Sequence, residues 1–203
     1  MPPRNLKGNP MKKHSIHSLI ATAALLACGA AQAAQLNLAG GTAISHITGI
    51  GDQSLLTLHA AVSATDPAAL PLIIRLDIAQ GLQSGGQAEQ TLGLGLYRFT
   101  GPAGAWRLEA GAEVGRWRDA GYTARHVAGV LRASYAIAPA VALDSTLKIG
   151  HSDGLLGGRY TALGAGLDLY QVDGGMVRIA YQHIDDGALP AQDRIGLSYG
   201  VSF

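Results

Sequence analysis

The chain ends with the stretch RIGLSYGVSF, residues 194–203. Apolar or aromatic residues stand at every second position of this stretch, and they are Ile195, Leu197, Tyr199, Val201 and Phe203. Alternation with period two predicts a β-strand that has one apolar face. An apolar edge strand of this kind would be an aggregation hazard in water. The pattern therefore favours a strand whose apolar face lies against lipid.

The same period recurs along most of the chain, in segments separated by turn-rich connections. No stretch after Ala33 reaches 18 consecutive apolar residues, and helical periodicity is not sustained anywhere. This pattern predicts an all-β, closed, antiparallel up-and-down transmembrane β-barrel of about 10 strands, or 8 if weak segments merge. The predicted segments are 35–46, 54–65, 71–81, 90–100, 106–118, 126–138, 140–152, 159–171, 176–185 and 194–203.

Charged residues fall almost entirely on the face opposite to the apolar one. A soluble sandwich would show the same alternation, so the charges alone do not decide between the two folds. Arg98 and Arg116 break the rule, but both lie near segment ends, where a long side chain can reach lipid headgroups. The expected lumen charge network consists of Arg75, Asp77, Arg107, Glu109, Glu113, Arg132, Asp144, Lys148, Asp168 and Arg178.

The N-terminus carries a targeting signal. Lys12 and Lys13 precede a short apolar run and then the small residues around Ala31 and Ala33, which is the order of a Sec signal peptide. We expect 1–10 to be a mis-start or disordered leader, 11–33 to be the signal peptide, and 34–203 to be the barrel. Cys28 is the only cysteine, and its lipidation is the alternative to cleavage after Ala33.

Composition limits the function. With 203 residues the chain has room for one domain, and its net charge of +1 supplies no basic stripe for nucleic acid.

The connections between the predicted strands are expected to alternate in length, with long outer loops such as 118–125 and 186–193 and short periplasmic turns such as 101–104.

Several segments are similar to a known family. The stretches 91–97, 101–102, 108–112, 177–183 and 196–203 resemble the YfaZ family of outer-membrane proteins. The resemblance covers about two thirds of the chain after Ala33 and consists of glycine-rich strands that many barrels share. It implies a small Gram-negative outer-membrane barrel and specifies no activity.

A catalytic alternative centres on His183. The stretch 183–189 resembles the catalytic stretch of outer-membrane lipid A deacylases, in which a histidine activates a serine two residues away. Asp185 stands where that serine is needed, so the resemblance argues against activity as much as for it. His183, Asp185 and Asp186 are also suitable ligands for a divalent cation, although solvated loop residues are the favoured interpretation.

The expected interior is close to neutral, because its acidic and basic residues are equal in number and can pair. A paired interior predicts a closed or very narrow pore in a barrel of this size. We therefore expect a non-enzymatic outer-membrane protein, without cofactor or metal, that has a structural, interaction or narrow-channel role. A soluble periplasmic β-protein is the remaining alternative. Expected partners are outer-membrane lipid, lipopolysaccharide and, through the C-terminal strand, the barrel-assembly machinery, and we expect a monomer.

Overall fold

The structure is a computed structural model that describes residues 34–64, 71–83, 86–119, 122–153, 158–187 and 190–203. The predicted leader and signal peptide, including Cys28, lie outside the described residues. The elements are β1 (Ala34–Ile47), β2 (Gly51–Ala64), β3 (Leu72–Gly81), β4 (Ala88–Thr100), the short 3-10 helix η1 (Pro102–Gly104), β5 (Trp106–Asp119), β6 (Tyr122–Ala138), β7 (Val141–Ser152), β8 (Gly158–Tyr170), β9 (Gly175–Asp186) and β10 (Gln192–Ser202).

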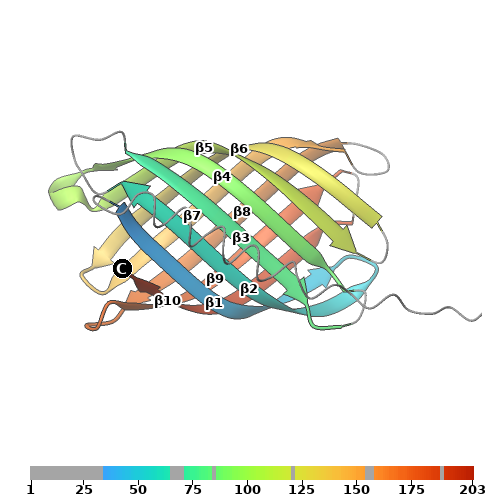
Figure 1. Ribbon diagram of the computed structural model, residues 1–203, viewed down its shortest axis with the longest axis horizontal. Coiled ribbons are helices and arrows are strands. Elements are labelled where there is room, and N and C mark those ends of the chain that lie inside the picture. Colours follow the sequence, from blue (N-terminus) through green and yellow to red (C-terminus); the bar gives the residue numbers. More distant parts are fainter. Residues whose placement is uncertain (1–33, 65–70, 84–85, 120–121, 154–157, 188–189) are drawn as a thin grey trace, which may run out of the picture. The chain divides into compact units, whose positions relative to one another are not determined.

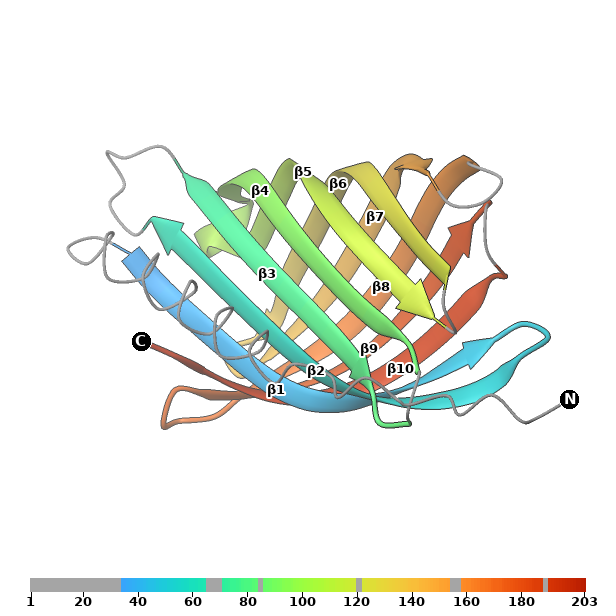
Figure 2. The ribbon, with the colours of Figure 1, turned by 45° about the vertical axis from the view of Figure 1, so that its right-hand side comes forward.

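The strands form one closed barrel in which each strand pairs antiparallel with its neighbours in sequence. They run obliquely across the wall, as Figures 1 and 2 show. β10 closes the barrel against β1, with Leu197 opposite Thr42 and Ile195 opposite Ile44. Two backbone hydrogen bonds join Leu36 and Phe203, at 3.1 and 2.8 Å. The predicted ten-stranded barrel is confirmed, and the eight-stranded alternative and the sandwich are wrong.

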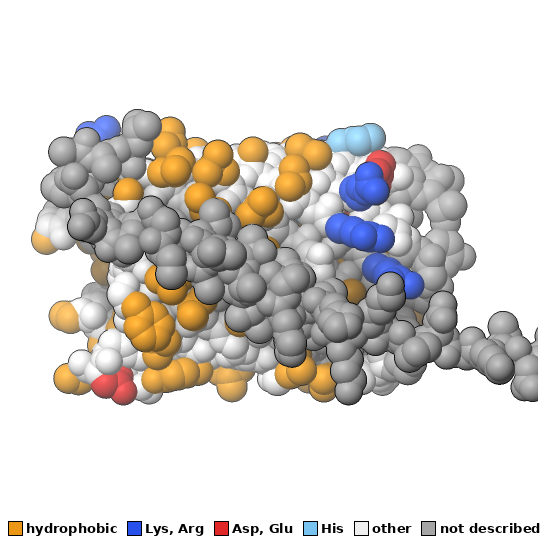
Figure 3. All heavy atoms as spheres, viewed as in Figure 1, with side chains coloured by type: hydrophobic (Ala, Val, Ile, Leu, Met, Phe, Trp, Pro, Cys, Tyr) orange, Lys and Arg blue, Asp and Glu red, His pale blue; other side chains and the backbone are white. Residues whose placement is uncertain are grey.

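The outer surface follows the predicted alternation. Leu56, Leu94, Leu131, Leu163 and Ile195 are between 50% and 62% exposed, although they are large and apolar. Figure 3 shows hydrophobic side chains spread over the visible face. Apolar side chains of this number on an outer wall are stable only in contact with lipid, so the alternation defines a membrane-facing band.

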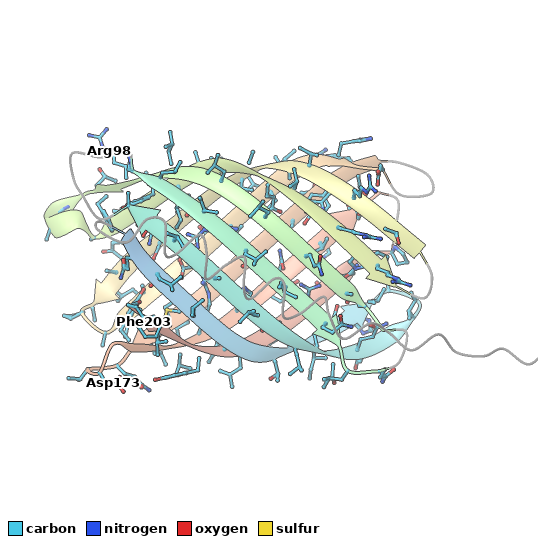
Figure 4. The ribbon with its side chains drawn as sticks, viewed as in Figure 1. Arg98, Asp173 and Phe203 are labelled. Carbon is cyan, nitrogen blue, oxygen red and sulfur yellow. The ribbon has the colours of Figure 1, made fainter. Side chains whose placement is uncertain are left out.

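The two ends of the barrel are distinguished by the chain ends. β1 begins and β10 ends at the same end, which we call the terminal rim; the opposite end is the distal rim. Figure 4 places Arg98, Asp173 and Phe203 at the terminal rim. The turn 101–104, which is expected on the periplasmic side, lies at the terminal rim, so we take the terminal rim as the periplasmic one.

The expected contrast between long and short connections is wrong. β5 continues to Asp119 and β6 begins at Tyr122, so most of the expected loop 118–125 is strand. The connection between β2, which ends at Ala64, and β3, which begins at Leu72, lies at the terminal rim and is longer than that one. The strands extend because their backbone groups remain paired beyond the apolar band, for example Trp117 with Ala124.

Among the described residues, the structure contains no helix with the length and apolar character needed to cross a membrane.

Candidate functional site

The lumen is the first candidate site, because it gathers charges that the sequence assigned to one face. The structure places all ten residues of the expected network on the inner side of the wall. Most of them are paired across neighbouring or more distant strands, and they form three groups, around Glu109, around Glu113 and around Arg178.

Glu109 on β5 stands between two arginines. Arg75 Nε on β3 donates to Glu109 Oε1 at 2.9 Å, and Arg132 Nη1 on β6 donates to the same oxygen at 3.0 Å. The Glu109 side chain is 7% exposed. A nearly buried carboxylate is tolerated when charged donors satisfy it, so this group holds three strands in a fixed arrangement.

Glu113 lies four residues further along β5 towards the distal rim and is more deeply buried. Its side chain is 1% exposed, and Lys148 Nζ on β7 lies 2.8 Å from Oε1. His126 Nε2 lies 3.4 Å from the same oxygen and stacks on the Tyr160 ring at 4.3 Å between centroids. His126 was missed in the sequence, although its parity with Arg132 on β6 could have revealed it.

The remaining charges lie towards the terminal rim or the opposite wall. Arg178 on β9 bridges Asp144 and Asp168, at 3.0 and 3.3 Å. Arg107 makes no close ion pair with any described residue and instead covers the Tyr97 ring, at 4.6 Å from the centroid. Asp77 is paired with a residue outside the expected set: His59 Nδ1 on β2 lies 2.8 Å from its carboxylate.

A further lumen cluster, which the sequence analysis missed, lies near the distal rim. Gln87 is fully buried, and its amide lies 2.8 Å from the Gln192 amide and 2.6 Å from Trp117 Nε1, with the oxygen turned towards the indole. The ion pair of Glu89 with Arg194, at 2.8 Å, lies against this cluster. We call these five residues the distal plug. Neutral amides carry no charge signal, which explains why the pattern did not show them.

The plug leaves almost no free space. A cavity of only about 10 Å³ remains beside it, lined in part by Glu89, Trp117 and Gln192. A water molecule needs at least about 10–15 Å³ by this kind of measure. Ile47 and Leu55, at 1% and 0% exposure, are also buried near the distal rim.

The outer face near the distal rim holds the residues of the catalytic and metal hypotheses. His183 Nδ1 lies 2.9 Å from Asp193 Oδ1, and the Tyr181 hydroxyl donates to the same oxygen at 2.6 Å. Asp185 shares this outer face, whereas Asp186 points inwards and is buried. Neighbouring residues on a strand point to opposite faces, so His183, Asp185 and Asp186 cannot converge on one cation. Within the described ranges no three acidic, histidine or cysteine side chains group to hold a metal.

The deacylase hypothesis requires a hydroxyl within hydrogen-bond reach of His183. The cross-strand neighbours of His183 are Asp193 on β10 and Leu163 on β8. Neither supplies one. The nearby Tyr181 hydroxyl donates to Asp193 Oδ1 and not to His183, so the arrangement orients the imidazole but pairs it with no hydroxyl among the described residues.

The C-terminal residues of the sequence analysis lie on the outer face of β10. Ile195, Leu197, Tyr199 and Phe203 are 62%, 54%, 48% and 73% exposed, and Val201 is half-buried. Arg98 and Arg116 also face outwards, Arg98 at the terminal rim and Arg116 near the distal rim. The two exceptions to the charge rule are thus at opposite ends of the lipid-facing band.

Comparison with known proteins shows the class of the fold. No family model and no curated protein sequence matches the chain. The COG4313 outer-membrane channel from Pseudomonas putida F1 is similar over 84% of this chain and 96% of its own, with 10% identity and a TM-score of 0.53. The KdgM porin, solved with disordered oligogalacturonate, covers 82% of this chain and 99% of its own, with 6% identity and a TM-score of 0.51. The β domain of the Bordetella autotransporter BrkA covers 85% and 100%, with 17% identity and a TM-score of 0.50.

At these identities the likeness concerns the fold, which is that of outer-membrane β-barrels. The closed barrel and its apolar outer band are consistent with that class in every strand. The protein is an integral β-barrel protein of the outer membrane.

Proposed function

We propose that this protein is a closed, non-enzymatic outer-membrane barrel whose role is structural or based on interactions at its surface. The observation that carries the proposal is the distal plug, whose buried side chains join β4 and β5 to β10 across the lumen. A ten-stranded barrel lies between filled eight-stranded barrels and open 16-stranded porins, so the side chains decide whether it conducts. Here they are large, paired and buried.

The lumen is not filled evenly. Near the terminal rim, Ser134 and Arg107 are only half-buried, and the Arg178 side chain is 35% exposed. Near the distal rim, Gln87, Ser152 and Leu55 are fully buried. The lumen therefore has a partly open space near the terminal rim, which we call the vestibule, and it is closed near the distal rim. A narrow channel is the second candidate, because movement of the plug alone would connect this vestibule to the other side.

Planar-bilayer recording tests the closed state. We expect the wild-type protein to show no steady single-channel steps, and the double variant Gln87→Ala/Trp117→Ala to conduct. Trp106→Ala is the matched control, because Trp106 is the other tryptophan and faces outwards at the terminal rim. Large, steady steps from the wild-type protein would rule out the filled lumen.

The catalytic alternative retains one favourable observation, the His183–Asp193 pair on the outer surface. Incubation of the purified protein with lipopolysaccharide, followed by mass spectrometry of released acyl chains, tests it. We expect no release. Acyl release that is lost in His183→Ala would favour the deacylase function over the closed, non-enzymatic barrel.

Assembly and family assignment belong to the same proposal. The outer face of β10 that ends at Phe203 is suited to recognition by the barrel-assembly machinery. We expect Phe203→Ser to lower the folded fraction in outer-membrane preparations, whereas Phe203→Tyr should retain it.

A closed barrel leaves no free sheet edge, which supports a monomer. Membership of the YfaZ family is inferred from the residues alone and adds no activity.

A further inference from the structure

Four arginines form a patch on the outer surface at the distal rim. They are Arg116 and Arg118 on β5, Arg125 on β6 and Arg159 on β8, and we call them the arginine patch. All four are exposed, and their parity points them outwards, away from the lumen. Figure 3 shows Lys and Arg side chains gathered near one end of the visible face, beyond the hydrophobic side chains.

The strand register forces like charges together in this patch. Arg116 on β5 is the direct cross-strand partner of Arg125 on β6. Cβ atoms of directly opposed residues lie about 4.5–5.5 Å apart, and like charges in that position destabilise a sheet. His151 on β7 is in turn opposite Arg159 on β8, so the patch extends from β5 and β6 to β8.

The patch lacks the acidic partners that the lumen provides. None of the four guanidinium groups makes an ion pair with any residue in the described ranges, whereas Arg75, Arg132, Arg178 and Arg194 in the lumen all do. Among the described residues, the exposed acids Asp153 and Asp185 lie near the patch, and the four arginines outnumber them. Asp153 Oδ1 accepts a hydrogen bond from the Arg125 backbone N–H at 2.6 Å.

With the terminal rim on the periplasmic side, the patch lies at the headgroup level of the outer leaflet. Val114 and Val127, which precede Arg116 and follow Arg125 on the same outer face, are 52% and 60% exposed and belong to the apolar band. The patch thus begins one cross-strand pair beyond the band. On the opposite side of the barrel, the outer face near the same rim carries acids, Asp52 and Asp193 among them. Attraction for an anion is therefore confined to the β5–β8 side.

We propose that the arginine patch is a binding site for the phosphate groups of lipid A, the membrane anchor of lipopolysaccharide. The patch faces sideways into the headgroup layer, which favours a lipid over a soluble polyanion. Arginine presents a planar fork of donors that matches phosphate, and a bound phosphate between Arg116 and Arg125 would relieve their repulsion. The site does not depend on whether the lumen conducts.

Thermal unfolding of the purified full-length barrel in neutral detergent tests the site. The probes are bisphosphorylated lipid A, the same lipid A after dephosphorylation, and inorganic phosphate, all with a chelator present so that divalent cations cannot bridge. The readout is the temperature at which the heat-resistant folded band disappears on electrophoresis. We expect bisphosphorylated lipid A to raise this temperature, dephosphorylated lipid A to raise it less, and inorganic phosphate at equal concentration to leave it unchanged.

Two variants complete the test. In Arg116→Gln/Arg125→Gln we expect the apparent affinity for bisphosphorylated lipid A to fall about tenfold or more, because charge-assisted hydrogen bonds are lost. The same variant without lipid should melt at or above the wild-type temperature, since the repulsion is gone, so a folding defect is distinguishable. Arg98→Gln, an outward arginine at the other rim, should respond like the wild type.

Three results would overturn the proposal. Equal protection by both forms of lipid A would mean that acyl chains, not phosphates, are recognised. A wild-type response from Arg116→Gln/Arg125→Gln would place the site elsewhere, and full protection by inorganic phosphate would indicate a simple anion site.

Discussion

At the residue scale, the lumen shows that buried charge in this barrel is organised around acids. Glu109 and Glu113 are nearly inaccessible, and each lies beside more than one basic side chain. A buried ion pair adds little net stability relative to an apolar pair, but removing one partner leaves an uncompensated charge. A substitution of either carboxylate is therefore expected to lower the free energy of unfolding more than a substitution elsewhere in the lumen.

Glu113→Gln is expected to destabilise the folded barrel by about 3–5 kcal/mol, because Lys148 would remain buried without its acidic partner. Equilibrium urea unfolding in lipid vesicles, followed by tryptophan fluorescence, measures the change. Asp185→Asn is the control, since Asp185 is exposed on the outer face and should change the free energy of unfolding by less than about 0.5 kcal/mol. Equal effects of the two substitutions would show that the lumen pairs do not determine stability.

At the element scale, alternation was sufficient to place the strands and assign their faces. The ten expected segments correspond one to one with β1–β10, since period two is a direct consequence of strand geometry. Strand ends were not predictable, because polar residues such as those of 119–122 pair their backbones as well as apolar ones do. The plug was missed for a related reason: Gln87, just before β4, and Gln192, at the start of β10, are 105 residues apart and meet only across the lumen of the closed barrel.

Close contact between strands depends on glycine at particular inward positions. A Cβ atom added to Gly150 on β7 would overlap the Val127 carbonyl oxygen and lie 2.6 Å from Ala128 Cα. Gly150→Ala is therefore expected to destabilise the barrel by about 1–3 kcal/mol through overpacking. Gly129→Ala, where the nearest atom is 3.7 Å away, should be tolerated. The same unfolding measurement compares them, and the prediction fails if both substitutions are neutral.

At the scale of the whole molecule, the barrel has two asymmetries. Along its axis, a half-exposed vestibule at the terminal rim leads to a plug near the distal rim. Around its circumference, the outer face near the distal rim is basic over β5–β8 and acidic or imidazole-bearing over β9, β10, β1 and β2. The first asymmetry concerns passage through the wall, and the second concerns the lipid that surrounds it. They use opposite faces of the barrel wall, so each can be changed without the other.

The axial asymmetry predicts one-sided access to the lumen. Ser134 is a half-buried lumen residue on β6 near the terminal rim, and Gln83 is exposed at the distal rim. In a Cys28→Ser background, which removes the only native cysteine, a membrane-impermeant maleimide added to intact cells should label Gln83→Cys and leave Ser134→Cys unlabelled. Permeabilising the outer membrane should then expose Ser134→Cys, because the vestibule opens towards the periplasm. Ser152→Cys, fully buried beside the plug, should stay unlabelled in both conditions. Labelling of Ser134→Cys in intact cells at the rate of Gln83→Cys would mean that the plug does not close the lumen, and labelling of Ser134→Cys alone would mean that the barrel has the opposite orientation.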